Sequence, residues 1–127
     1  MPGLMLLTAV GCSTPGRQPA PLPTATTTVA EFGALVFTSV CSACHGERGQ
    51  GLLAPALIGE RASFARFGGS ARAYYDYIRS NMPQNAPGSL TVDQYLAVTT
   101  YLLLQNKLVP PDAALAEDSL DSIQLPH

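Results

Sequence analysis

The sequence predicts an all-α domain, and two capping boxes together with the spacing of apolar residues support this fold class. Thr28 with Glu31, and Thr91 with Gln94, each precede an apolar stripe at helical spacing. No alternating apolar and polar run long enough for a half-buried β-strand occurs in the 127 residues. Apolar residues make up 46% of the chain and charged residues 13%, which excludes a wholly disordered protein. The length indicates one domain.

The first predicted helix covers residues 29–40, directly after the Thr28 cap. Its apolar stripe consists of Phe32, Leu35, Val36, Phe37 and Val40. A glycine-rich loop follows over residues 46–59. Residues 61–67 then have the composition of a short helix that ends at two glycines.

Two further helices are predicted in the second half of the chain. Ser70 is a suitable N-cap for a helix over residues 71–80, which ends before Pro83 because the residue preceding a proline avoids helical geometry. The last helix runs from Thr91 to about Asn106 and has a broad apolar face. The whole pattern predicts a small fold of three to five helices.

Residues 1–12 have the pattern of a signal segment. A short apolar run ends at Gly11 before Cys12, and it is too short to span a bilayer. Residues 9–12 resemble a bacterial lipobox, although Ala9 stands where leucine is commoner and no basic residue precedes the run. The resemblance implies export, acylation of Cys12 and attachment to the lipid bilayer. The alternative is a structural cysteine in a frayed terminus.

Two segments of biased composition flank the predicted domain, which we place at residues 29–108. Residues 13–28 are rich in proline and threonine and cannot bury a core, so we expect a tether. The formal net charge of −2 comes from residues 109–127, where acidic residues occur without Lys or Arg. We expect this acidic C-terminal tail to be an exposed or docking segment. The weak overall charge excludes a nucleic-acid partner.

Cys41 and Cys44, followed by His45, form the most specific motif in the chain. Two thiols three residues apart lie on one side of a helical turn, where they can add to both vinyl groups of one haem while the next imidazole reaches the iron. A redox dithiol and half of a zinc site are the alternatives. The first lacks the βαβ pattern of thioredoxin-like proteins, and the second lacks further ligands. We therefore predict one covalently attached haem c, with His45 as an iron ligand.

Residues 31–107 resemble a class I c-type cytochrome. Gly33 and Phe37 match the small and aromatic residues of that family's first helix, and Tyr101 matches the aromatic residue of the last helix. The resemblance implies that the N- and C-terminal helices pack together beside one covalent haem. It also implies that the carbonyl oxygen of Pro55 accepts a hydrogen bond from the haem histidine, which makes the histidine a better donor to iron.

The second axial ligand is predicted to be Met82. His127 is the only other histidine and ends the tail without an apolar frame, while the other methionines lie in the predicted signal segment. Met82 precedes a proline after a helix, and this arrangement resembles the ligand loop of the family. The alternative is that the methionine is core filler. Haem iron held by His45 and Met82 has no open coordination site and can only cycle between ferric and ferrous states.

Apolar and aromatic residues are expected to wall the haem and exclude water, and we assign Leu57 and Tyr75 to cofactor binding. The other expected wall residues are Leu52, Leu53, Ile58, Phe64, Phe67, Tyr74 and Leu102. Many relatives use a tryptophan to hold a haem propionate, but this chain has none. The residues that could take this role are Arg61, Arg66, Tyr74 and Tyr75.

These features predict an electron-transfer protein rather than an enzyme. We expect a monohaem cytochrome that is anchored at the outer, periplasmic face of a bacterial membrane and exchanges electrons with redox partner proteins. The resemblance suggests a respiratory or photosynthetic complex, such as alternative complex III, a cytochrome c oxidase or a reaction-centre system. One alternative is a haem-based gas sensor in which a ligand displaces Met82. Another is a peroxidase, for which no distal histidine or arginine stands beside Met82.

Overall fold

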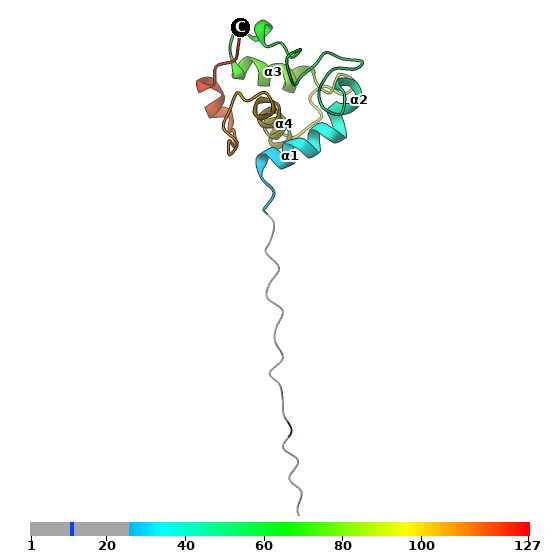
Figure 1. Ribbon diagram of the computed structural model, residues 1–127, viewed down its shortest axis with the longest axis vertical. Coiled ribbons are helices and arrows are strands. Elements are labelled where there is room, and N and C mark those ends of the chain that lie inside the picture. The colour runs from blue at the N-terminus through cyan, green and yellow to red at the C-terminus, as the bar shows by residue number, and fades with distance from the viewer. Residues whose placement is uncertain (1–10, 12–25) are drawn as a thin grey trace, which may run out of the picture.

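The described part of the chain begins just before the first capping box. The computed structural model describes residues 11 and 26–127 (Figure 1). The predicted signal segment with Cys12 and most of the predicted tether therefore lie outside the described residues. The elements in order are α1 (Val29–Val36), the π-helical turn η1 (Phe37–Cys41), α2 (Ser42–His45), the 3-10 turn η2 (Ala65–Phe67), α3 (Ala71–Asn81), α4 (Val92–Gln105) and the 3-10 helix η3 (Glu117–Ser122).

The all-α prediction is confirmed for the residues that the structure describes. These residues form helices and turns, and their β-structure is limited to one isolated antiparallel bridge between Ser70 and Gln124. Both capping boxes form, and the side chain of Ser70 accepts a hydrogen bond from the amide of Ala73 as the cap of α3. The local start signals in the sequence therefore set the beginning of all three longer helices.

The first helical segment is longer than predicted. We expected it to end near residue 40, but η1 and α2 continue it to His45. The amide of Ser42 donates to the carbonyl oxygen of Phe37, five residues earlier, which produces one wide π turn. The hydroxyl groups of Thr38 and Ser39 bond to carbonyl oxygens of the preceding turn. The widened turn carries the helix directly into the Cys41–His45 motif.

The predicted contact between the first and last helices is confirmed. A Cβ atom at Gly33 would lie 2.0 Å from the carbonyl oxygen of Ala97, so only glycine allows α1 to approach α4 this closely. The ring centroids of Phe37 and Tyr101 lie 5.5 Å apart, and Phe37 is 0% exposed. Figure 1 shows α4 in the centre of the domain, and it contacts both α1 and α3.

One segment differs from the prediction, and for another the structure decides between the two expectations. The helix expected over residues 61–67 is only the three-residue turn η2, which ends at Gly68 with a φ of 60°. Residues 109–127, set apart as a tail from their composition, pack onto α3 through η3 and bury Leu120 and Leu125 in the core. The C-terminal segment is thus part of the same folded unit, because its leucines complete the hydrophobic core beside α3.

Replacing Phe37 by alanine should lower the free energy of unfolding by about 3–5 kcal/mol, because the ring is fully buried and its removal leaves a cavity. Urea titration of the haem-loaded protein measures this loss. Phe32→Ala on the same helix is the matched control, since Phe32 is 37% exposed and should cost much less. Equal losses in the two variants would show that the ring of Phe37 contributes nothing specific to the α1–α4 contact.

Candidate haem site

The Cys41–His45 motif lies where η1 passes into α2. Cys41 ends the π turn and is half-buried, whereas Cys44 on α2 is exposed. His45, the last residue of α2, is 8% exposed. The two cysteines are not joined by a disulfide, so both sulfur atoms can serve in covalent attachment of haem. The motif therefore presents one inward and one outward thiol next to a buried imidazole.

The imidazole of His45 is held by the carbonyl group of Pro55, as the resemblance implied. Nδ1 of His45 lies 2.7 Å from the carbonyl oxygen of Pro55. A carbonyl oxygen can only accept, so Nδ1 must carry the proton and Nε2 must hold the free lone pair. That tautomer leaves Nε2 available to bind iron. The carbonyl group also increases the electron density of the ring and makes it a better ligand.

The glycine-rich loop folds back onto the motif and places Pro55 there. The amides of Leu53 and Ala54 both donate to the carbonyl oxygen of Cys44 at 2.9 Å, and the amide of Gly51 donates to the carbonyl oxygen of His45 at 2.8 Å. Gly51 has a φ of 90°, a conformation that side chains disfavour. The loop is therefore tied to the motif by three backbone hydrogen bonds from residues just before Pro55.

Asn106 attaches the end of this loop to α4, a role that the sequence analysis did not assign. Its side-chain amide donates to the carbonyl oxygen of Leu57 at 2.8 Å, and its carbonyl oxygen accepts from the amide of Gly59 at 3.1 Å. The same amide group also donates to the carbonyl oxygen of Leu102. An asparagine at a helix C-terminus was the available signal, but its loop partners lie almost fifty residues away in the chain.

The two alternative uses of the cysteine pair find little support. Burial, and secondarily the charge of neighbouring Cys44, raises the pKa of the Cys41 thiol to about 11. Redox dithiols need the opposite shift, because the thiolate is the reactive form. Within residues 26–127, the structure brings together no group of three His, Cys, Asp or Glu side chains that could hold a metal ion.

Met82 is the C-cap of α3 and packs, half-buried, against the core. Its amide donates to the carbonyl oxygen of Ile78 at 2.9 Å, and its carbonyl oxygen accepts a hydrogen bond from the hydroxyl of Tyr95 at 2.7 Å. His127, the rejected alternative, is exposed and lies against Gly69. Ligation of iron by Met82 stays a prediction.

Tyr74 has a buried hydroxyl group without a hydrogen-bond partner in the described structure. Its ring lies between those of Phe64 and Phe67, with centroid distances of 5.3 and 5.0 Å. Burial, with a smaller effect of Cys41, raises the pKa of Tyr74 well above its ordinary value. The hydroxyl therefore stays protonated and able to donate. An unpaired buried donor beside Cys41 fits a haem carboxylate as its acceptor.

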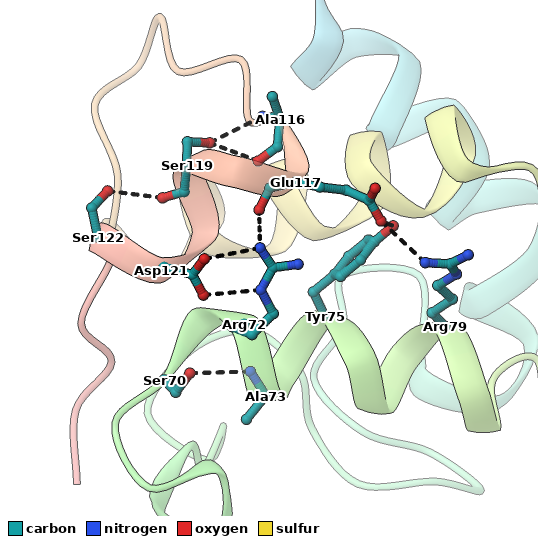
Figure 2. A network of polar contacts seen from close by, with 10 residues as sticks. All are labelled: Ser70, Arg72, Ala73, Tyr75, Arg79, Ala116, Glu117, Ser119, Asp121 and Ser122. Atoms are coloured by element: carbon teal, nitrogen blue, oxygen red, sulfur yellow. Dashed lines mark hydrogen bonds and ion pairs between the residues drawn. The ribbon is translucent and has the colours of Figure 1, made fainter.

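The other three propionate candidates are engaged elsewhere or exposed. The guanidinium of Arg66 lies over the ring of Tyr77, with its central carbon 4.4 Å from the centroid, and Arg61 is exposed. Figure 2 shows the hydroxyl of Tyr75 at Glu117, at a donor–acceptor distance of 3.0 Å. Among the four candidates, Tyr74 is the one with a buried donor that lacks a partner in the described residues.

The contacts of Tyr75 belong to a polar network that fastens η3 to α3 (Figure 2). Glu117 also accepts from Arg79 at 3.1 Å, and Arg72 pairs with Asp121 at 3.0 Å and donates to the backbone carbonyl of Glu117. The hydrogen bond from Arg72 lowers the pKa of the Asp121 carboxyl. Burial, followed by the bond to Glu117, raises the pKa of Tyr75. The network had no local sequence signal, because its partners lie about forty residues apart.

The expected haem wall divides into inner and outer residues. Leu52 and Leu53 are 70% and 84% exposed in the protein chain, and their contact with haem stays a prediction. Other members are buried or half-buried in the core cluster, namely Leu57, Ile58, Phe64, Phe67, Tyr74, Tyr75 and Leu102.

The helical fold, the Cys41–His45 motif and the bond between His45 and Pro55 define a class I c-type cytochrome. A family model described as cytochrome c oxidase, cbb3-type, subunit III matches residues 29–102. The chain belongs to this family and carries covalently bound haem c, with Cys41 and Cys44 in the attachment positions. It is a monohaem electron carrier. Domains of this class typically lie outside the cytoplasm and act with redox partners.

Two solved structures are similar to the chain, and the first of them supports the shared fold. A chain of the sulfane dehydrogenase SoxCD from Paracoccus pantotrophus is 26% identical with a TM-score of 0.65, and the match covers 89% of this chain and 69% of that chain. A chain of the thiosulfate dehydrogenase TsdBA from Marichromatium purpuratum is 24% identical with a TM-score of 0.48, covering 66% and 19% of the two chains. No curated protein matches the chain. Within the described residues, no helix is both long and apolar enough to cross a membrane.

Replacing Tyr74 by phenylalanine should change the pH dependence of the reduction potential. We expect its hydroxyl to stabilise the charged form of a haem propionate, so the pKa of that propionate should rise by about one unit in Tyr74→Phe, since a hydrogen bond to a charged group contributes about 1.5–3 kcal/mol. The reduction potential falls when the propionate ionises, so in Tyr74→Phe this fall should occur at a higher pH than in wild type. Potentiometric titration over a range of pH measures it. Tyr75→Phe, which loses a bond to Glu117 instead, is the control. An unchanged titration in Tyr74→Phe would exclude the propionate contact.

Proposed function

We propose that this cytochrome is the electron-accepting subunit of a membrane-associated oxidoreductase complex, with both axial positions of its haem filled by the protein. Bound haem c supplies a one-electron couple between ferric and ferrous iron. The observation that carries the proposal is the hydrogen bond from Nδ1 of His45 to Pro55, which fixes the tautomer with a free Nε2. The chain's part is to hold the ligands, exclude water and present the haem edge to a partner.

Met82 is proposed as the second iron ligand. Its position at the C-cap of α3 and the hydrogen bonds to both of its backbone polar groups support a fixed ligand. A thioether favours ferrous iron and so raises the reduction potential relative to a second imidazole. With both axial positions filled, neither substrate nor peroxide has an open coordination site. This arrangement favours electron transfer over the gas-sensor and peroxidase alternatives.

The proposed complex lies at the outer face of a bacterial membrane. Acylation of Cys12 would anchor the chain, and the tether over residues 13–28 would let the haem domain reach partners within tens of ångströms of the bilayer. The likeness to a chain of a sulfane dehydrogenase supports a role beside a dehydrogenase rather than as a free carrier. Alternative complex III and related respiratory or photosynthetic assemblies fit the same lipid-anchored arrangement.

Replacing Met82 by alanine should abolish the weak near-infrared charge-transfer band from sulfur to ferric iron, because the only proposed sulfur ligand is lost. Absorption spectroscopy of the oxidised holoprotein measures this band. His127→Ala is the control and should leave it unchanged. Persistence of the band in Met82→Ala would exclude the ligand assignment. Tight binding of carbon monoxide by the reduced wild-type protein would instead favour the sensor function.

Intact mass spectrometry of the mature protein should show loss of residues 1–11, one covalent haem and acyl chains on Cys12. Two or more chains are expected, since a single acyl chain gives only marginal membrane binding. Cys12→Ser should release the haem domain from the membrane fraction without changing its absorption spectrum. A mature mass that retains residues 1–11 and lacks acyl chains would overturn both cleavage and anchoring.

A further inference from the structure

One buried hydroxyl group closes the loop that follows α3. The hydroxyl of Tyr95 donates a hydrogen bond to the carbonyl oxygen of Met82 at 2.7 Å and accepts one from the amide of Leu90 at 3.4 Å. Met82 begins this loop and Leu90 ends it. Tyr95 is 2% exposed, so water competes little for either bond.

The position of this hydroxyl is set by α4 and not by the loop. Tyr95 lies in the first turns of α4, directly after the capping box of Thr91 and Gln94. Its ring belongs to the hydrophobic core cluster. A tyrosine has only two side-chain torsions, and packing of the ring fixes both of them. Tyr95 therefore acts as a rigid arm that extends from α4 to the start of the Met82 loop.

The loop has few other attachments. Residues 84–89 are exposed, and their backbone bonds stay within the loop, from Ala86 to Pro83 and from Ser89 to Ala86. The amide of Met82 is held by α3 through Ile78, but its carbonyl group is held only by Tyr95 among the described residues. Without that bond, the loop could move the thioether away while α3 stayed in place.

We infer that Tyr95 is a positioning residue for the axial ligand: its hydroxyl holds the backbone of Met82 so that the thioether stays on the iron against competing ligands. This inference rests on the proposed ligation of iron by Met82. It concerns how firmly the ligand is held, which decides whether the haem works as a closed electron carrier or opens to small molecules.

Imidazole is a suitable probe, because it binds ferric haem only when the thioether has left. Its apparent affinity is its intrinsic affinity reduced by the fraction of protein in which the site is open. Loss of the Tyr95 hydroxyl should raise that fraction, and hence the apparent association constant, about tenfold, which corresponds to ~1.4 kcal/mol.

The experiment titrates the oxidised, full-length holoprotein with imidazole and follows the haem spectrum. Tyr95→Phe should bind imidazole about tenfold more tightly than wild type, because it loses the hydrogen bond to Met82 together with the longer one from Leu90. Tyr101→Phe is the matched control on the same helix, since the hydroxyl of Tyr101 has no hydrogen bond within residues 26–127, and its affinity should match wild type. A Tyr95→Phe affinity equal to wild type overturns the inference.

Two further variants separate this inference from its premises. Met82→Ala should bind imidazole most tightly of all; if it binds like wild type, the ligand assignment itself fails, and Tyr95 has no ligand to position. Leu103→Ala removes a fully buried side chain of α4 and lowers global stability without touching the loop. If it raises imidazole affinity as much as Tyr95→Phe, the effect is general loosening and the inference is wrong.

A second variant at position 95 tests the inference if Tyr95→Phe does not fold. Incorporation of 3-fluorotyrosine at position 95 retains the ring and makes the hydroxyl a stronger donor. The bond to Met82 should strengthen, so the apparent imidazole affinity should fall below that of wild type. An unchanged or increased affinity would show that the hydroxyl does not restrain the ligand.

Discussion

The hydrogen bond from His45 to Pro55 is the constraint on which the rest of the site depends. A histidine can bind iron through one ring nitrogen only if the other nitrogen holds the proton. The carbonyl group of Pro55, 2.7 Å from Nδ1, fixes that state. Pro55 can stand there only because the preceding loop turns back on the motif, with Gly51 in a conformation that favours glycine. The loop in turn needs an attachment outside itself, which Asn106 supplies.

Helix α4 links both sides of the proposed haem site. The first helical segment packs against Ala97 and Tyr101 of α4 and leads into the Cys41–His45 motif. Asn106, after the last turn, holds the loop that carries Pro55, and Tyr95, near the first turn, holds Met82. The two holding residues are separated by about 16 Å along the helix axis, at ~1.5 Å per residue. One helix thus holds the backbone behind both proposed axial ligands, which limits how far the two loops can move relative to each other.

Local signals in the sequence predicted most of the fold and the chemistry of the site. Capping boxes act within four residues, and the Cys41–His45 motif acts within five, so both can be recognised without a structure. The bonds of Tyr95 and Asn106 join residues that no local pattern connects. The acidic composition of residues 109–127 left open whether this segment is exposed or docked, and it gave no sign that η3 packs against α3. Leu120 and Leu125 are isolated apolar residues in this segment, and their burial cannot be recognised without the position of α3.

The C-terminal segment shows why charge alone does not decide between an exposed and a docked segment. Its ion pairs with Arg72 and Arg79 are solvent-exposed, and such pairs contribute little to stability. Full burial of a leucine contributes roughly 1.5–3 kcal/mol. The leucines therefore provide most of the attachment, and the acidic groups set its register on α3. The segment supports α3 through Arg72, Tyr75 and Arg79, whereas Tyr95 holds the backbone of Met82 at the end of that helix. Both attachments limit movement at the end of α3. A haem whose ligands move little between the ferric and ferrous states needs little reorganisation energy, which favours fast electron transfer.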